Sequence, residues 1–189
     1  PGAFAARLRE WGVSGDSVVV AYDDGNSMYA ARFWWMLRWL GHRKAQVLDG
    51  GMRRWMQLGL PLDETIPSHP PGNFVAHPHP EFVVGAQEVL VASRDGTSRI
   101  LDARAPERYR GDVEPIDAVA GHVPGARNHP FTSSLGADGR FLPAAELRAA
   151  LEQQLGGMPT QKTITMCGSG VTACHLLLAM ELAGLDGAR

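Results

Sequence analysis

The sequence contains only two cysteines and two lysines among its 189 residues, and the cysteine shortage excludes several classes of protein. Cys167 and Cys174 lie seven positions apart and form no Cys-x-x-Cys pair. A disulfide framework or a cysteine zinc site would need more cysteines at regular spacings. We therefore expect a protein of a reducing compartment, the cytoplasm, with no metal and no cofactor.

The sequence also lacks an excess of charge and a long apolar run. Its net charge is −2, so no electrostatic footprint for nucleic acid or for a membrane surface is present. No stretch approaches the roughly 20 apolar residues of a membrane span, and no signal peptide is visible. The first residue is Pro1 rather than methionine, which leaves open a leader removed earlier. A hydrophobic content of 44% supports the core of one or two small α/β domains.

Apolar segments of strand type alternate with segments of helical periodicity along most of the chain, and this alternation predicts parallel sheets covered by helices. The second half also contains a polar stretch without periodicity, for which we expect a long loop over residues 103–119. We expect helices over residues 4–11, 28–40, 86–92, 143–155 and 171–183, and strands over residues 17–22, 46–48, 99–102 and 164–166.

The proline-rich stretch from Leu60 to Pro80 differs from its surroundings. It holds six of the thirteen prolines and three histidines, and it has no helical or strand period. The histidines are separated by prolines and have no partners at ligand spacing, so a solvated linker is favoured over a metal site. We therefore divide the chain into a first domain over residues 1–60, a linker over 61–80 and a second domain over 81–189.

The most informative stretch runs from Thr163 to Ala173. A short apolar strand is followed by a loop that begins at Cys167 and then by a helix that starts near Val171. Backbone N–H groups converge at such a turn, and the helix dipole is positive there, so both favour a thiolate and an anion bound to it. The alternative is a buried structural cysteine, which is the interpretation that we prefer for Cys174 inside the helix.

An internal repeat relates the two halves of the chain. A shift of 143 residues places Ala30 on Ala173, Gly41 on Gly184 and the segment around Val20 near Ile164. Cys167 then falls on Asp24, so only the second copy has a nucleophile. Because each copy is incomplete at the opposite end, we expect the chain to be a piece of a larger tandem protein.

Four groups of residues match one known family: Cys167–Ala173; Asp102–Arg104 with Glu107–Gly111; Gly121–Ala126; and Ala31–Trp35 with Leu48–Gly51. With them the chain resembles the two-domain rhodanese-type sulfurtransferases, which use thiosulfate or 3-mercaptopyruvate. The resemblance implies a five-stranded parallel sheet flanked by helices in each domain. It also implies that residues 1–60 are the C-terminal part of the inactive first domain and that residues 81–189 are the catalytic second domain.

The resemblance further implies an activity and a set of site residues. Cys167 would accept a sulfane sulfur from a small anionic donor as a persulfide and pass it to cyanide or a thiol. Arg108 matches the substrate-binding arginine of the family, with Arg110 a weaker candidate, and the loop residues Gly168, Ser169, Gly170, Val171 and Thr172 would bind the substrate. Asp102 and Arg104 are expected to form a structural pair, and His122 is expected to hold the glycine turn.

Two departures concern the donor. Ile116 and Asp117 follow Glu114-Pro115, where mercaptopyruvate members usually carry a second arginine. Ser169 stands where thiosulfate members often carry a lysine. We therefore expect use of both donors, with a slight preference for 3-mercaptopyruvate.

Two other functions remain as alternatives. A cysteine-dependent phosphatase would end its anion loop with an arginine six positions after the cysteine, where this chain has Ala173. A non-catalytic rhodanese-like binding module would normally have lost the cysteine, which this chain keeps. The sequence favours the sulfurtransferase over both.

Overall fold

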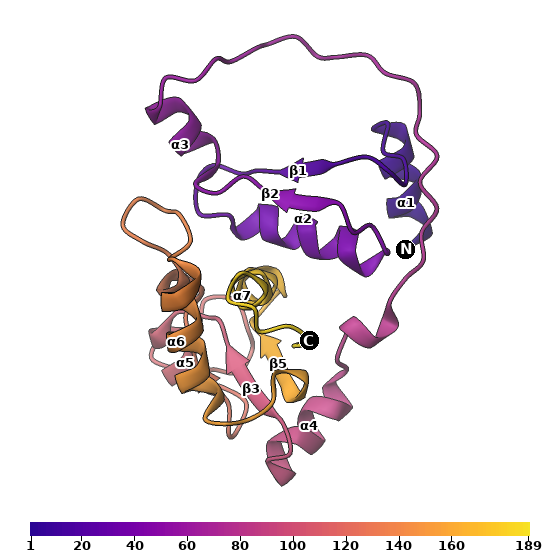
Figure 1. Ribbon diagram of the computed structural model, residues 1–189. Coiled ribbons are helices and arrows are strands. Elements are labelled where there is room, and N and C mark those ends of the chain that lie inside the picture. Colours follow the sequence, from indigo (N-terminus) through magenta and orange to yellow (C-terminus); the bar gives the residue numbers. More distant parts are fainter. The chain divides into compact units, whose positions relative to one another are not determined.

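All named strands of the protein pair in parallel, in two separate sheets. A computed structural model describes residues 1–189, which divide into two units, Pro1–Phe82 and Val83–Arg189. The first unit has a two-stranded sheet and the second a three-stranded sheet in the order β4-β3-β5. Figure 1 shows helices alternating with the strands in each unit. No helix has the length and apolar character that crossing a membrane requires.

The first unit is built around β1 and β2. These strands pair from Val19 with Ala45 to Ala21 with Val47. Helix α2 packs against both strands and buries an apolar stripe that includes Ala30, Trp34 and Leu37. The elements in order are α1 (Gly2–Glu10), β1 (Val19–Ala21), α2 (Met28–Trp39), β2 (Ala45–Val47), α3 (Gly51–Gln57) and the short 3₁₀ helix η1 (Pro80–Phe82).

The proline-rich stretch has no regular secondary structure before Pro80, where η1 begins, but it is not solvated over its whole length. The backbone N–H groups of Gly72, His77 and His79 donate to carbonyl oxygens of the first unit. The ring of Phe74 is buried and lies edge-on against His42, with ring centroids 5.4 Å apart. Residues 72–79 therefore pack as part of the first unit, because buried apolar area at Phe74 and backbone hydrogen bonds outweigh the entropy of a free linker.

The second unit places β3 between its two neighbours. Ile100 pairs with Ile164 of β5, and Leu101 pairs with Arg127 of β4. The elements in order are α4 (Ala86–Asp95), β3 (Arg99–Asp102), α5 (Pro106–Arg110), β4 (Arg127–Asn128), η2 (Phe131–Ser134), α6 (Ala144–Leu155), η3 (Thr160–Lys162), β5 (Thr163–Met166) and α7 (Val171–Leu182).

Both faces of the second sheet are covered by helices. Successive residues of β3 point to opposite faces, so Ile100 joins one apolar cluster and Leu101 another. The cluster around Ile100 includes Ala92 of α4, whereas that around Leu101 includes Leu151 of α6 and Leu176 of α7. Figure 1 shows α4 and α6 on opposite sides of the β3–β5 pair. Such two-sided burial is typical of a central parallel strand, and it agrees with the buried side chains of Ile100 and Leu101 on the two faces of β3.

The predicted fold class, an α/β fold of parallel sheets with flanking helices, is confirmed. The sheets have two and three strands, fewer than the five that the resemblance implies. The expectation of an uninterrupted loop over residues 103–119 is wrong, because α5 forms within it. This helix has Pro106 in its first turn and ends at Gly111, whose φ of 84° is left-handed, so both ends carry ordinary helix signals.

The predicted internal repeat is visible in the helices after β1 and β5. Adding 143 to the bounds of α2 gives those of α7. The residue before each helix has a left-handed backbone, with φ of 59° at Ser27 and 78° at Gly170. The two loops therefore have related backbones, although the second begins with a cysteine and the first with aspartates.

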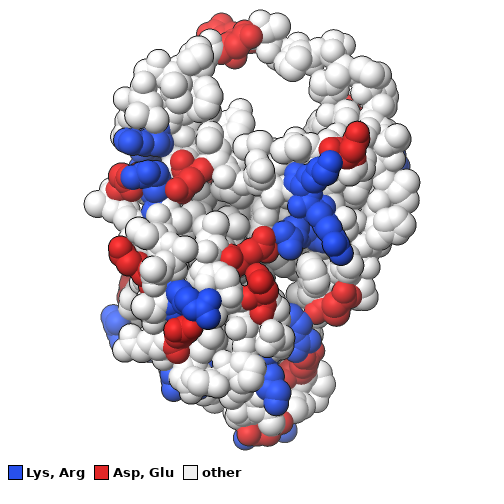
Figure 2. Space-filling model, viewed as in Figure 1, with Lys and Arg blue, Asp and Glu red and all other residues white.

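Acidic and basic side chains are interspersed on the face shown in Figure 2. Most of that surface belongs to other residues, in keeping with a charged fraction of 20% in the sequence.

Candidate active site

Cys167 lies directly after β5, at the carboxyl end of a parallel strand. The loop 168–170 connects it to α7, and Gly170 occupies the residue before that helix with a left-handed backbone. This conformation favours glycine and directs the backbone N–H of Gly170 to the Sγ of Cys167 at 3.0 Å. The thiol is half-buried and unbridged, so it combines protection from bulk water with access.

Hydrogen bonds at the sulfur control the ionisation of Cys167. Burial raises the pKa of this thiol, but the combined effect of the hydrogen bonds is larger and in the opposite direction. The pKa of Cys167 therefore lies below the usual value for cysteine. The donors are the hydroxyl of Thr172 and the backbone N–H groups of Ala173, Ser169 and Gly170. A donor set of this kind stabilises a thiolate, and it would equally stabilise an anionic sulfur attached to it.

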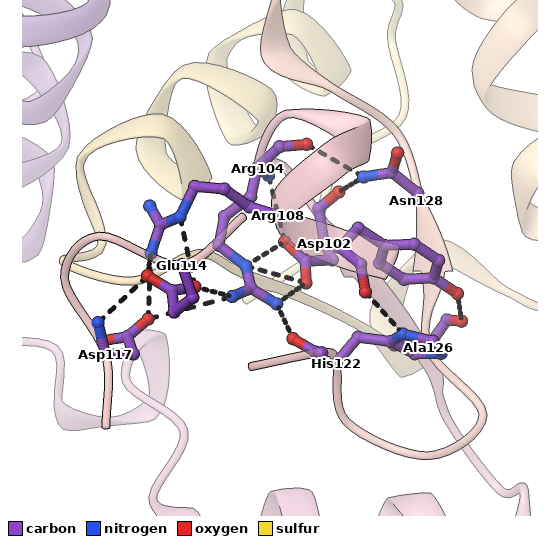
Figure 3. Close-up of polar contacts among 10 residues, drawn as sticks. Asp102, Arg104, Arg108, Glu114, Asp117, His122, Ala126 and Asn128 are labelled. Atoms are coloured by element: carbon purple, nitrogen blue, oxygen red, sulfur yellow. Dashed lines mark hydrogen bonds and ion pairs between the residues drawn. The ribbon is translucent and has the colours of Figure 1, made fainter. Parts of the chain in front are cut away.

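Arg108 lies beside this loop. Its Nη2 is 3.5 Å from the position that a Cβ atom at Gly168 would occupy, which is an ordinary van der Waals distance and places the guanidinium next to the residue after Cys167. The guanidinium itself is held by Glu114, with Nη2 to Oε1 at 2.6 Å and Nε to Oε2 at 3.3 Å (Figure 3). Hydrogen bonds from Arg108, and then from the backbone N–H groups of Asp117 and Ile116, lower the pKa of Glu114 to about 2.

A buried ion pair supports the base of the site. Oδ2 of Asp102, at the end of β3, accepts a 2.7 Å hydrogen bond from Nη2 of Arg104. The same nitrogen donates to the carbonyl oxygen of Gly121 at 2.7 Å, which ties the glycine turn to the strand. The hydrogen bonds with Asp102 raise the pKa of Arg104, so the guanidinium stays charged. The predicted pairing of Asp102 with Arg104 is confirmed (Figure 3).

His122 holds the glycine turn from its other side, as predicted. Its Nδ1 lies 2.8 Å from the carbonyl oxygen of Tyr109, and the two rings stack with centroids 3.7 Å apart. The hydroxyl of Tyr109 donates to the carbonyl oxygen of Ala126 at 2.6 Å. His122 thus connects α5 to the turn that precedes β4.

The predicted site residues fall into two groups. Arg108 lies against the loop formed by Gly168, Ser169 and Gly170, and Val171 and Thr172 begin α7. Arg110, in contrast, forms an exposed ion pair with Asp112 at 2.8 Å. The opposite directions of Arg108 and Arg110 follow from α5, because residues two apart on a helix do not share a face.

Sequence reasoning missed the acidic partners of Arg108. Glu114 and Asp117 entered only as part of a departure from a family pattern, yet both contact the guanidinium. A signal was present in the alternation of acidic and basic residues over 102–117. Alternating charges without a helical period indicate ion pairs within a folded loop, but they do not indicate which residues pair.

The first unit contains a related loop that is filled differently. Oδ1 of Asp23 accepts from the backbone N–H groups of Gly25 and Ser27, and Oδ2 accepts from those of Tyr29 and Ala30. This carboxylate thus satisfies the N–H groups at the start of α2. The loop around Cys167 instead directs its N–H groups to sulfur.

Cys167 lies after a parallel strand, and its sulfur accepts backbone N–H groups at the start of a helix. This arrangement defines the class of parallel α/β proteins that have an anion-stabilising cysteine loop. Within that class the family is shown by comparison with known proteins. The profile of the family described as "Rhodanese-like domain" matches residues 3–58 and 85–188. The chain therefore belongs to the rhodanese-like domain family.

Relatives in this family are similar over almost the whole chain. A probable 3-mercaptopyruvate sulfurtransferase of Pseudomonas aeruginosa is 46% identical over 185 residues, which cover 97% of this chain and 65% of the relative. The thiosulfate sulfurtransferase of Bos taurus is 39% identical, covering 96% of this chain and 62% of the relative. The crystal structure of the 3-mercaptopyruvate sulfotransferase SseA of Escherichia coli superposes with a TM-score of 0.84 at 38% identity, covering 99% and 70% of the two chains.

The chain thus spans about two thirds of the length of the curated relatives that it matches. These comparisons show the family of the chain and agree with its fold.

Proposed function

We propose that this chain is part of a sulfurtransferase that carries a sulfane sulfur on Cys167. The donor is a small anion, thiosulfate or 3-mercaptopyruvate, and the acceptor is cyanide or a thiol. The observation that carries the proposal is the hydrogen bonding of the Cys167 sulfur, which lowers the pKa of the thiol at a half-buried position. The names of the relatives support both donors.

In the first half-reaction, the thiolate of Cys167 attacks the transferable sulfur of the donor, which is the outer sulfur of thiosulfate or the thiol sulfur of 3-mercaptopyruvate. With thiosulfate, the S–S bond breaks and sulfite leaves with its electron pair. With 3-mercaptopyruvate, the C–S bond breaks, and the enolate that leaves takes up the thiol proton to become pyruvate. Both routes leave a persulfide whose terminal sulfur is anionic, and the N–H groups of the loop would stabilise that charge.

In the second half-reaction, the acceptor attacks the terminal sulfur of the persulfide. The S–S bond breaks, the thiolate of Cys167 returns, and cyanide leaves as thiocyanate. Ser169 and the backbone of Gly168 to Thr172 are proposed to bind the transferred sulfur. Arg108 is proposed to bind the anionic group of the donor as a charged fork. Arg110, which is engaged with Asp112, is the weaker candidate for the same role.

The division of labour between the halves is part of the proposal. We assign catalysis to residues 81–189, the second rhodanese-like domain. Residues 1–60 are assigned to an inactive first domain, in which the carboxylate of Asp23 lies among the N–H groups of the loop. Residues 61–80 connect the two. A cytoplasmic location is proposed because a catalytic thiolate has to be kept reduced.

The loop argues against a phosphatase. Ala173 stands where such an enzyme needs an arginine, so a phosphoryl group would lack its main cationic partner. A persulfide has a single anionic sulfur, and N–H groups alone can stabilise that charge. The retained cysteine likewise argues against a binding module without chemistry.

The test measures thiocyanate formed from cyanide with each donor, together with the intact mass after exposure to donor alone. We expect activity and a gain of one sulfur atom in the native chain and in Cys174→Ala, whose sulfur is buried within α7. We expect neither in Cys167→Ser. Retention of the added sulfur by Cys167→Ser would refute the proposal.

A further inference from the structure

The guanidinium of Arg108 already has two carboxylate partners in this structure. Besides Glu114, Oδ2 of Asp117 lies 3.0 Å from Nη2 of Arg108. Figure 3 shows the two carboxylates on the same side of the arginine. A donor anion that is to bind Arg108 has to displace one of them or to add a third negative charge.

Glu114 is the fixed partner. Its side chain is only 4% exposed, and it also lies 3.4 Å from Nη1 of Arg104. Its Oε1 accepts the backbone N–H groups of Ile116 and Asp117, each at 3.0 Å. Five N–H donors from four residues on a buried carboxylate make its departure unfavourable, so Glu114 orients Arg108 rather than competing for it.

Asp117 is the displaceable partner. Its side chain is 41% exposed, and its carboxylate contacts Arg108 at 3.0 Å and lies 3.8 Å from Arg104. Water can replace these contacts when the side chain rotates away, and exposed ion pairs contribute little to stability. Asp117 can therefore exchange with a second anion at low cost.

Asp117 also lies beside the cysteine loop. Its Oδ2 is 3.5 Å from the position of a Cβ atom at Gly168, the same distance as Nη2 of Arg108. The carboxylate therefore occupies the side of the guanidinium that faces the residue after Cys167. A donor whose sulfur reaches Cys167 would place its own anionic group in this region.

The net charge of the cluster also disfavours the binding of an anionic donor at Arg108. Three carboxylates, of Asp102, Glu114 and Asp117, surround two guanidiniums, of Arg104 and Arg108. The excess of one negative charge would disappear if Asp117 were neutral. Because Coulomb energy scales with the charge of the ligand, this excess disfavours a dianion more than a monoanion.

We propose that Asp117 is a specificity-determining residue that occupies the anion position on Arg108 and competes with the anionic group of the sulfur donor. Its carboxylate raises the KM of every anionic donor, and that of dianionic thiosulfate more than that of monoanionic 3-mercaptopyruvate. This inference rests on the proposed sulfurtransferase function and on the proposed role of Arg108 in it.

The test compares Asp117→Asn with the native chain. Asparagine keeps the shape and removes the charge, so KM for 3-mercaptopyruvate should fall by about fivefold while kcat changes by less than about twofold. KM for thiosulfate should fall by a larger factor. The matched control is Asp138→Asn, which makes the same change in net charge and removes a 2.7 Å ion pair with Arg140 at a similarly exposed aspartate. It should leave both KM values unchanged.

Binding without turnover separates this inference from the proposed function. In a Cys167→Ser background, calorimetry with each donor should show tighter binding when Asp117→Asn is added. An active native enzyme whose Asp117→Asn variant binds donors no more tightly, or an equal effect of Asp138→Asn, would overturn the inference alone. If the donors bind the Asp117→Asn variant more tightly but the native chain forms no thiocyanate, the role of Asp117 is upheld and the proposed reaction is refuted.

Discussion

The replacement Asp102→Asn tests the buried pair beneath the site. Asparagine has nearly the shape of aspartate, but it carries no charge and offers one oxygen instead of two. In the native chain, Oδ1 of Asp102 accepts from the backbone N–H and the Nε of Arg104, and Oδ2 accepts from Nη2. The replacement leaves a guanidinium that is only 6% exposed without its main counter-ion.

The expected loss can be worked from burial. Removing one partner of a buried pair costs about 3–5 kcal/mol, because the remaining charge stays desolvated. Glu114 still lies 3.4 Å from Arg104, so we expect the lower end, about 3 kcal/mol. For a unit of this size, that corresponds to a fall in Tm on the order of 15 °C. Disorder of Arg104 would also loosen Glu114 and so raise the KM of the donor.

Urea unfolding offers a clean measurement, because all five tryptophans lie in the first unit. Far-UV circular dichroism follows both units, whereas tryptophan fluorescence follows the first. The dichroism transition should move to lower urea in Asp102→Asn. The control is again Asp138→Asn, which breaks an ion pair of the same 2.7 Å length on the surface and should cost less than about 1 kcal/mol. Equal, small losses in the two variants would refute the reasoning from burial.

Two further predictions concern the loops. In Thr172→Val, the hydroxyl donor to the Cys167 sulfur is lost, so the pKa of Cys167 should rise. The pH profile of iodoacetamide alkylation should then move to higher pH, whereas the control Thr172→Ser should keep the native profile. An unmoved profile in the valine variant would contradict this account. Replacing Asp23 by alanine leaves four backbone N–H groups without their acceptor, so the free energy of unfolding of the first unit should fall by about 1–3 kcal/mol. Tryptophan fluorescence during urea unfolding measures this loss, and the control Asp24→Ala, at an exposed aspartate, should show little change. A loss no larger than in the control would argue against the capping role of Asp23.

Local patterns predicted the elements that carry the cysteine. The apolar run before Cys167, the glycines after it and the helical spacing beyond Val171 are all contiguous, and each depends on neighbours within a few residues. The short helix α5 was missed because its five residues are too few to show a period. Pro106 and Gly111 are typical of the two ends of a helix, but they are equally typical of a polar loop.

The proline-rich stretch shows a limit of another kind. Its composition predicts a linker, and the absence of regular structure agrees with that composition. Its packing at Phe74 depends on His42 and on carbonyl groups of the first unit, which are distant in sequence. The sequence shows one aromatic residue, Phe74, within this segment, but it does not indicate against which residues the ring will pack.

The sequence by itself determined the fold class, the position of Cys167 between a strand and a helix, and the similarity of the two loops, because these depend on short-range periodicity, on glycine and on a repeat of fixed length. Only the tertiary structure decided what surrounds Arg108. Glu114 and Asp117 reach it through a loop without a period, and Gly168 lies next to it in the loop after β5, 60 residues away in sequence. Charges act through space, so their partners are set by how the chain folds back on itself and not by their order along it.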